Sequence, residues 1–403
     1  VNLCRDYDLQ MESNDFKAQL LMDAFINEKD LNQVLDYKNI VMNVSLDDIK
    51  RVAKEYLSDN YIVIFNEQGK PGKSQKIKKP GYKPIEPPVG QSSLYARQFQ
   101  NMATNKVEER FADWSKVQER PLNDYSRVYY PQNTENDVFT LVLKYGAGTE
   151  VFPKLAYAAS LMDNAGILGN LTPQALKEEL SKLHATCSVQ ADDDYLYVTL
   201  RGYENTLQDA CLLLTRQLLM PGLDEKQLNS LIGNAASSRI TRKDDVNSLA
   251  SALNQYLIYG DESPYKTELT DKQLVEMTIS ELTGQINEAI KYAAEIHYSG
   301  TLPFETVYQI LSGSLPLVSG ERQTQSPVVK KTRDYTENTV FFIPNSDAQQ
   351  SQIYFYIPMG EYKKELRVKS SAFNQYMSGG FSGLIMNEIR EKNSMAYTAY
   401  GGV

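Results

Sequence analysis

The sequence predicts an α+β fold in which an antiparallel sheet carries helices on one face, repeated in tandem along the chain. Strand-like stretches and amphipathic helical stretches follow one another in a recurring order. The helices expected after Ser45 and after Ser280 each lead to a strand, and these two serines are 235 positions apart. The helices expected to end at Met162 and Met377 are 215 positions apart. Such a period is too long for a solenoid and favours tandem copies of one domain.

Residues 1–66 are expected to be the C-terminal end of one such domain. An amphipathic helix at 46–57 follows Ser45, and Asp48 completes a capping-box pattern at its start. A buried strand is expected at 61–65. Residues 67–112 then read as a linker rich in proline and lysine with a short helix. The lysines offer an alternative, contact with phosphate, but the prolines and the lack of interleaved aromatic residues favour a solvated connector.

Residues 113–318 are expected to form one complete domain. Strands are expected at 138–143, 185–189, 195–200 and 294–298. Helices are expected at 153–162, 172–183, 205–219, 224–242, 246–259 and 272–290. Three consecutive aspartates, Asp192, Asp193 and Asp194, separate the second and third strands. They offer oxygens for Ca²⁺, but a hairpin turn is favoured because too few ligands are fixed nearby.

A second linker at 319–335 is expected to precede the N-terminal part of a third domain at 336–403. That part should contain strands at 340–343 and 353–357 and a helix pair at 366–377 and 382–391. A strand beginning near Tyr397 is cut short by the end of the sequence. Because the first residue is not methionine either, we expect the chain to be a segment of a longer protein.

Composition excludes several classes of site. The chain has 403 residues, a formal net charge of −9, two histidines and three cysteines. An acidic chain is a poor candidate for nucleic-acid binding, and no apolar run approaches the roughly 20 residues of a membrane span. The histidines lie far apart, and Cys187 and Cys211 are expected in the core. Ser160 with His184 as a hydrolase pair is disfavoured because no nucleophile-elbow sequence surrounds Ser160.

One tract carries a family resemblance. Residues 381–397 contain a helix expected to end at Ile389-Arg390-Glu391-Lys392, then a short loop, then Ala396-Tyr397, with Arg390 and Tyr397 seven positions apart. This pattern resembles the signature of the non-catalytic domains of insulinase/pitrilysin-like (M16) zinc metallopeptidases. The helix-then-strand endings described above are similar to the close of M16 domains. The resemblance implies tandem domains of the M16/LuxS-like metallohydrolase fold.

M16 enzymes carry an H-x-x-E-H zinc motif on the first long helix of their first domain, and a further glutamate completes the ligand set. In the complete domain of this chain, the two histidine positions fall on Tyr157 and Leu161, and the glutamate position falls on Ser160. The distal ligand should lie near 236–238, where no carboxylate occurs. The resemblance therefore implies that this segment binds no metal and that the zinc sits in an upstream catalytic domain of the parent protein.

The function implied is that of a non-catalytic segment of an M16-like zinc metalloendopeptidase, inactive alone, which helps to enclose and position a peptide substrate. Its partners would be the peptide and the upstream M16 domains of the same chain. Arg390 would bind a substrate carbonyl or carboxylate, and Tyr397 would donate to the oxyanion of the tetrahedral intermediate. Taken alone, Arg390 is also explained by the helix dipole and Tyr397 by strand propensity. The alternative is a catalytically dead M16-like peptide-binding or assembly protein.

Overall fold

The structure is a computed structural model, and it describes residues 2–65, 69, 81, 93–103, 108, 111, 113–315, 324, 329–345, 350–360 and 363–403. These residues form two compact units. The first comprises Val1–Leu228 and Met277–Pro327, and the second comprises Asn229–Glu276 and Val328–Val403. Much of the expected linker at 67–112 lies outside the described residues, and α6 (Leu94–Gln100) is a short helix within it. The expected domain boundaries stay a prediction.

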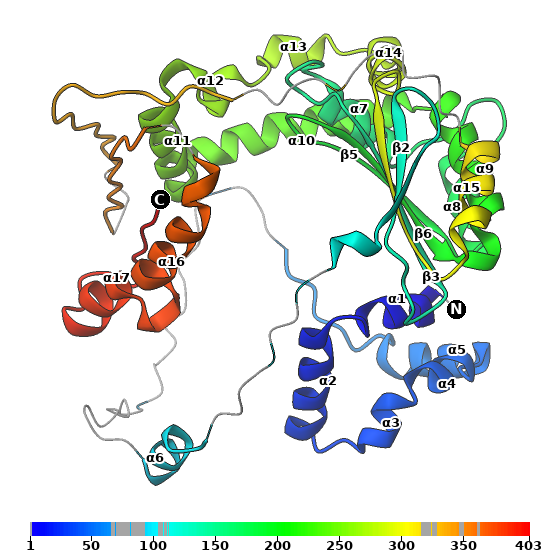
Figure 1. Cartoon of the computed structure of the whole chain (residues 1–403), viewed down its shortest axis with the longest axis horizontal. Coiled ribbons are helices and arrows are strands. Elements are labelled where there is room, and N and C mark those ends of the chain that lie inside the picture. Colours follow the sequence, from blue (N-terminus) through cyan, green and yellow to red (C-terminus); the bar gives the residue numbers. More distant parts are fainter. Residues whose placement is uncertain are drawn as a thin grey trace. The chain divides into compact units, whose positions relative to one another are not determined.

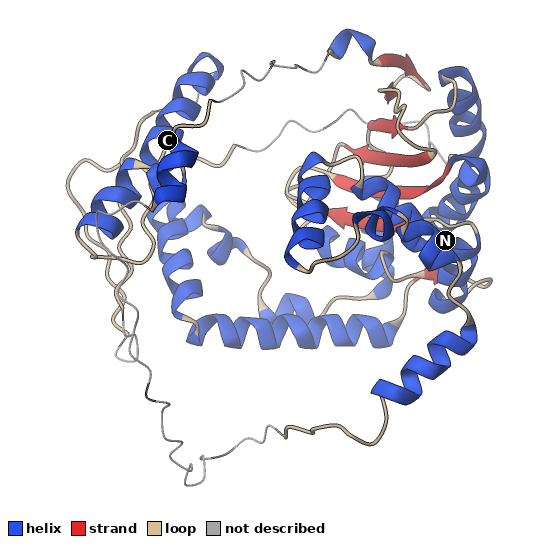
Figure 2. Cartoon of the chain, turned by 90° about the horizontal axis from the view of Figure 1, so that it is seen from below, coloured by secondary structure: helices blue, strands red, loops and turns tan. Residues whose placement is uncertain are grey.

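A six-stranded sheet forms the centre of the first unit (Figures 1 and 2). In spatial order its strands are β1 (Gln118–Pro121), β2 (Ser126–Tyr130), β8 (Ala294–Ser299), β3 (Val138–Tyr145), β6 (Leu196–Tyr203) and β5 (Thr186–Ala191). All neighbours are antiparallel except β2 and β8, which are parallel. The predicted α+β fold is confirmed, with this one parallel pair added to the expected antiparallel sheet.

One face of the sheet is covered by helices and the other is largely open. On β3, Phe139, Leu141 and Leu143 are fully buried, whereas Thr140 and Val142 between them are half-buried. Because side chains alternate across a strand, this pattern marks one covered face. The covering layer consists of α7 (Leu155–Met162), α8 (Pro173–Lys182), α9 (Leu207–Leu219), α14 (Ile279–Ala289) and α15 (Phe304–Ser314). Of these, α7 contacts β5 and α14, and α9 contacts β6 and α15.

Local signals set several of these elements. Thr172 caps α8 by accepting a hydrogen bond from the Ala175 amide at 3.2 Å. The β5–β6 hairpin turns at Asp192, whose carboxylate accepts from the amides of Asp194 and Tyr195 at 2.9 and 2.7 Å. The carboxylate is thus used by the turn itself, as the hairpin interpretation predicts. A two-residue ribbon, β4 (Gly166–Ile167) with β7 (Pro221–Gly222), completes the unit's strands.

The single helix predicted at 272–290 is wrong, because the structure divides it into α13 (Asp271–Val275) and α14. Thr278 has an extended backbone and accepts from the Glu281 amide at 3.2 Å, so it begins a new helix. A threonine that caps a helix cannot also lie inside one, since its backbone is non-helical. The apolar periodicity on both sides of this break hid it from the sequence analysis.

A buried carboxylate fixes the connection between β8 and α15. Glu204 accepts hydrogen bonds from the Tyr298 hydroxyl at 2.9 Å and from the Thr301 and Leu302 amides at 2.6 and 2.8 Å. A Cβ atom on Gly300 would lie 2.2 Å from the Glu204 carboxylate, so this close approach requires glycine. Satisfied by these donors, Glu204 can remain buried beside the sheet.

The three cysteines are free thiols. Cys4 and Cys211 are buried and Cys187 is half-buried. Burial raises the pKa of the Cys211 thiol to about 12, so it stays protonated near neutral pH. The expected core placement is confirmed for Cys211, which lies on the buried side of α9.

The described N-terminal residues 2–56 contain the helices α1 (Asn2–Gln10), α2 (Asn14–Ile26), α3 (Leu31–Leu35), α4 (Tyr37–Met42) and α5 (Leu46–Tyr56). The predicted capping box of α5 is confirmed. The Asp48 amide donates to the Ser45 hydroxyl, and the Ser45 amide donates to the Asp48 carboxylate, both at 3.1 Å. The hydrogen bonds from Ser45 hold the pKa of the Asp48 carboxyl below its ordinary value. The buried Arg5 attaches α1 to the sheet region by donating to the His184 carbonyl at 2.7 Å.

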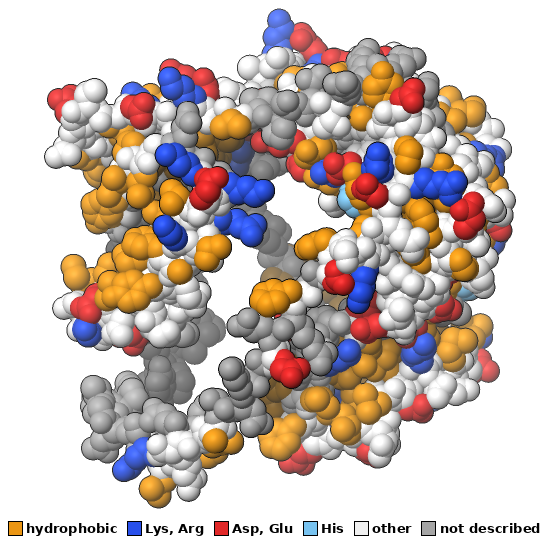
Figure 3. All heavy atoms as spheres, in the orientation of Figure 1, with side chains coloured by type: hydrophobic (Ala, Val, Ile, Leu, Met, Phe, Trp, Pro, Cys, Tyr) orange, Lys and Arg blue, Asp and Glu red, His pale blue; other side chains and the backbone are white. Residues whose placement is uncertain are grey.

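The apolar stripe of α5 is exposed. Leu46, Ile49, Val52 and Tyr56 lie at helical spacing on the outside of the first unit, and Figure 3 shows hydrophobic side chains gathered over the N-terminal helices. The buried strand predicted at 61–65 is wrong, since this segment is exposed and has no regular structure. A strand needs a partner strand, and none of the described strands pairs with this segment.

The second unit is helical in its described part. It contains most of α10 (Glu225–Asp244), followed by α11 (Val246–Tyr259), α12 (Pro264–Thr267), α13, α16 (Arg367–Ser378), α17 (Leu384–Met386) and a π-helical segment, η6 (Asn387–Lys392). The strands predicted at 340–343 and 353–357, and the one beginning near Tyr397, are wrong. These segments lack regular structure, and Phe342 and Phe355 are exposed. As at 61–65, the described residues provide no partner strand.

Among the helices of the described residues, none combines the length and the apolar character that crossing a membrane requires.

The alternation on β3 predicts unequal effects of substitution. Leu143→Ala should lower the free energy of unfolding by about 2–5 kcal/mol, because it opens a cavity in a fully buried layer. Val142→Ala, the matched change on the open face, should cost about 1 kcal/mol or less. Urea denaturation followed by circular dichroism measures both, and equal losses would contradict a sheet covered on one face.

Candidate functional site

Arg390 lies on η6, a π-helical segment. Such segments are uncommon in proteins and occur frequently at functional sites. The guanidinium forms an ion pair with Glu391, with 3.4 Å between Nε and Oε1. On the same segment, Glu388 pairs with Lys392. The side chain of Arg390 is 29% exposed, so it is partly held against the protein while remaining accessible.

Tyr397, the second residue of the predicted pair, lies next to Arg390. The Arg390 guanidinium carbon is 4.6 Å from the centre of the Tyr397 ring, which is a cation–π contact. Tyr397 is itself 78% exposed. The structure therefore brings the two predicted side chains together on an accessible surface of the second unit.

Backbone bonds turn the chain back between these two residues. The Ser394 amide donates to the Arg390 carbonyl and the Met395 amide to the Ile389 carbonyl, both at 3.0 Å. Ser394 adopts a left-handed backbone with φ of 49°, which tightens the turn. This local folding explains how a spacing of seven positions produces side-chain contact.

The residues after Tyr397 are attached to α16. The Asn374 side chain donates to the Val403 carbonyl at 2.8 Å and accepts from the Val403 amide at 2.7 Å. The Ser378 hydroxyl makes the same pair of bonds with Gly401, at 2.7 and 2.8 Å. The segment bearing Tyr397 is therefore fixed on both sides, although it forms no strand. The sequence analysis missed Asn374 and Ser378 because nothing in a polar helix face marks such partners.

The positions where an M16 zinc motif would stand lie on α7. Leu161 is buried, Tyr157 is half-buried and Ser160 is exposed. Residues 236–238, near which the distal ligand was expected, lie exposed on α10. In the described part of the chain, no group of three or more His, Cys, Asp or Glu residues is placed to hold a metal ion. A phenol, a hydroxyl and an aliphatic side chain do not fit zinc.

The disfavoured pair of Ser160 and His184 shows no mutual hydrogen bond among the described residues. His184 has a left-handed backbone with φ of 52°, and its ring packs edge-on against Tyr203 at 6.3 Å between centroids. The Ser160 carbonyl accepts from the Asn164 side chain on the exposed side of the helix. Both residues are thus accounted for by local packing.

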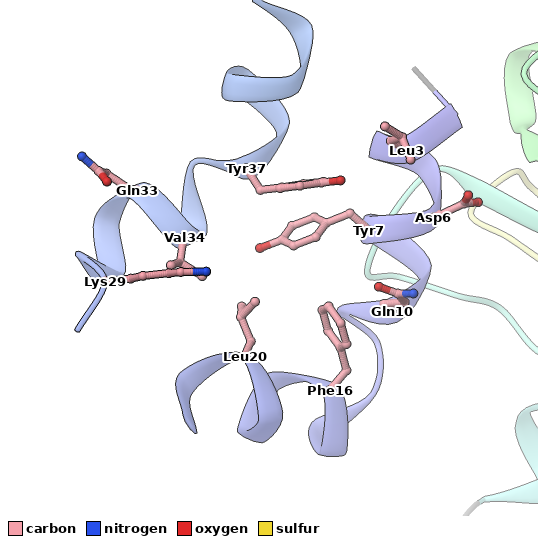
Figure 4. Close-up of a pocket in the computed structure, with 10 residues that line it drawn as sticks. All are labelled: Leu3, Asp6, Tyr7, Gln10, Phe16, Leu20, Lys29, Gln33, Val34 and Tyr37. Carbon is pink, nitrogen blue, oxygen red and sulfur yellow. The ribbon is translucent and has the colours of Figure 1, made fainter. Parts of the chain in front are cut away.

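A pocket that the sequence analysis did not predict lies among the N-terminal helices (Figure 4). It has a volume of about 600 Å³ and is lined from α1 to α4, with Tyr7, Phe16 and Tyr37 forming an aromatic wall and Lys29 on the opposite side. We call it the N-terminal pocket. The wall assembles from three different helices, so no contiguous sequence pattern could have revealed it.

Residues 286–403 match the model of a sequence family described as the peptidase M16 inactive domain. The match covers less than a third of the chain and shows what this part of it is similar to. The matched residues include Arg390 and Tyr397, and the resemblance predicted from the tract 381–397 is confirmed. A comparison with curated protein sequences finds no significant match.

Solved structures share the M16 fold at low sequence identity. A peptidase M16 inactive domain from Pseudomonas fluorescens is 18% identical, with a TM-score of 0.53 and 70% of each chain covered. The periplasmic protease PqqL from Escherichia coli is 14% identical with a TM-score of 0.57, and the match covers 88% of this chain but 37% of PqqL. A protease from Helicobacter pylori is 12% identical with a TM-score of 0.51, covering 71% of this chain and 70% of that one. At these identities the likeness establishes the M16 fold alone.

The residues on α7 predict that the purified chain retains no stoichiometric zinc. After dialysis against zinc and then against metal-free buffer, elemental analysis should find well under one equivalent per chain, because Tyr157 and Leu161 offer no nitrogen or carboxylate ligand. One tightly held equivalent would contradict this interpretation of α7.

Proposed function

We propose that this chain is a non-catalytic segment of an M16-type zinc metalloendopeptidase that helps to enclose a peptide substrate and to position it for an upstream catalytic domain. The observation that carries the proposal is the contact between Arg390 and the exposed Tyr397. Neither the helix dipole nor strand propensity accounts for that contact, because Tyr397 lies on no strand and remains open to solvent.

In this proposal Arg390 binds the substrate and Tyr397 stabilises the transition state. The guanidinium of Arg390 binds a backbone carbonyl or a carboxylate of the peptide through charge-assisted hydrogen bonds, which suit its planar array of donors. Stacking against the Tyr397 ring limits the orientations of the guanidinium and so reduces the entropy lost on binding. The Tyr397 phenol then donates to the oxyanion that develops on the scissile carbonyl.

The exposed stripe on α5 supports the placement of this chain next to further M16-type structure. Leu46, Ile49 and Val52 form an apolar helix face, and water-exposed stripes of this kind are normally buried against another element. Residues 61–65, apolar and without a partner strand, continue from that helix. Both features fit a segment that completes a preceding domain, whose sheet supplies the missing edge.

The proposed role of Tyr397 leads to a kinetic prediction for the full-length parent enzyme. Tyr397→Phe should lower kcat by about 10²-fold with little change in KM, since one transition-state hydrogen bond is removed. Tyr400→Phe is the matched control, because Tyr400 is on the same segment and is equally exposed, at 78%. Its kcat should stay unchanged.

Steady-state kinetics with a fluorogenic peptide distinguish the outcomes. Equal activity of both variants would assign Tyr397 to packing and remove the proposed oxyanion role. A parent that cleaves no peptide and has no H-x-x-E-H helix upstream would instead support a catalytically dead M16-like peptide-binding or assembly protein.

A further inference from the structure

The N-terminal pocket has the dimensions and lining of a ligand site. Its volume of about 600 Å³ falls within the range of roughly 300–1,000 Å³ that is typical of small-molecule pockets, and its wall is aromatic with a few polar groups at the edge. The rings of Tyr7 and Tyr37 lie 5.0 Å apart with 30° between their planes. Phe16 meets Tyr7 edge-on at 6.1 Å. This wall suits an apolar or aromatic group.

The charges around the pocket leave one cation in excess. Asp6 is neutralised by the buried Arg5, whose guanidinium lies 2.6 Å from the Asp6 carboxylate. Lys29 forms no ion pair or side-chain hydrogen bond with another described residue, and neither does the Tyr7 hydroxyl. Figure 4 shows the Lys29 ammonium and the Tyr7 hydroxyl directed into the same space, whereas Tyr37 turns its hydroxyl toward Leu3. Two convergent donors beside an apolar wall favour a carboxylate attached to an apolar body.

We propose that the N-terminal pocket binds the free carboxyl-terminal residue of a peptide when that residue is aromatic or aliphatic. The carboxylate lies between Lys29 and the Tyr7 hydroxyl, and the side chain packs on Phe16 and Tyr37. A peptide fits better than a free amino acid, because the pocket is larger than one side chain requires and the amide group of Gln10, beside Tyr7, can bond to peptide backbone. The inference rests on residues outside the second unit, so it stands or falls independently of Arg390 and Tyr397.

Calorimetric titration of the whole chain tests the ligand class. N-acetyl-leucyl-phenylalanine should bind at least about tenfold more tightly than its carboxyl-terminal amide, since the amide forfeits the charge-assisted bonds. It should also bind more tightly than N-acetylphenylalanine. Equal binding of acid and amide would overturn the carboxylate site, and equal binding of N-acetylphenylalanine would overturn the assignment to a peptide.

Paired variants test the two donors. Lys29→Met and Tyr7→Phe should each weaken binding of the dipeptide acid, by about tenfold for the lysine, and should leave binding of the amide unchanged. Lys54→Met and Tyr56→Phe, both on α5 and outside the pocket lining, are the controls and should bind like the unmodified chain. Each substitution removes one polar group, the ammonium of a lysine or the hydroxyl of a tyrosine, and keeps a side chain of similar size. Circular dichroism verifies folding. If the test variants behaved like the controls, the proposed site would be refuted.

Discussion

The buried face of β3 is the constraint on which the rest of the fold depends. Side chains alternate across a strand, so Phe139, Leu141 and Leu143 share one face and must be shielded from water together. The helical layer supplies that shield, and α7 contributes to it with an almost wholly apolar sequence. Leu161 belongs to this buried layer, at a position that the M16 resemblance aligns with a metal ligand. In this chain α7 serves packing.

The sequence was sufficient wherever a structure is decided by neighbours along the chain. The capping box at Ser45, the cap at Thr172 and the hairpin at Asp192 each depend on hydrogen bonds between residues two or three positions apart. Arg390 and Tyr397 were singled out by the resemblance of the tract 381–397 to M16 sequences, and the tight turn between them brings their side chains into contact. What the spacing alone did not reveal is that the two side chains stack without a strand to support them.

Features that need a distant partner were not predictable in the same way. The segments 61–65, 340–343 and 353–357 have strand-like residues, yet a strand forms only where another strand offers an edge. Propensity cannot report whether that edge exists. The N-terminal pocket could not be predicted either, because Tyr7, Phe16 and Tyr37 become neighbours only through the packing of separate helices. The sequence around a single tyrosine on a helix does not indicate which aromatic side chains of other helices will pack against it.

The bond from Arg5 to the His184 carbonyl has a consequence for how the chain tolerates change in length. The described residues Leu57 and Asp113, which flank the stretch from 58 to 112, belong to the same compact unit, so the chain that joins them closes a loop. The entropic free-energy cost of closing such a loop grows only with the logarithm of the loop length, by about 0.6 kcal/mol for each doubling. Insertions and deletions there should therefore accumulate among homologues far more freely than in α1 or in the hairpin that follows His184.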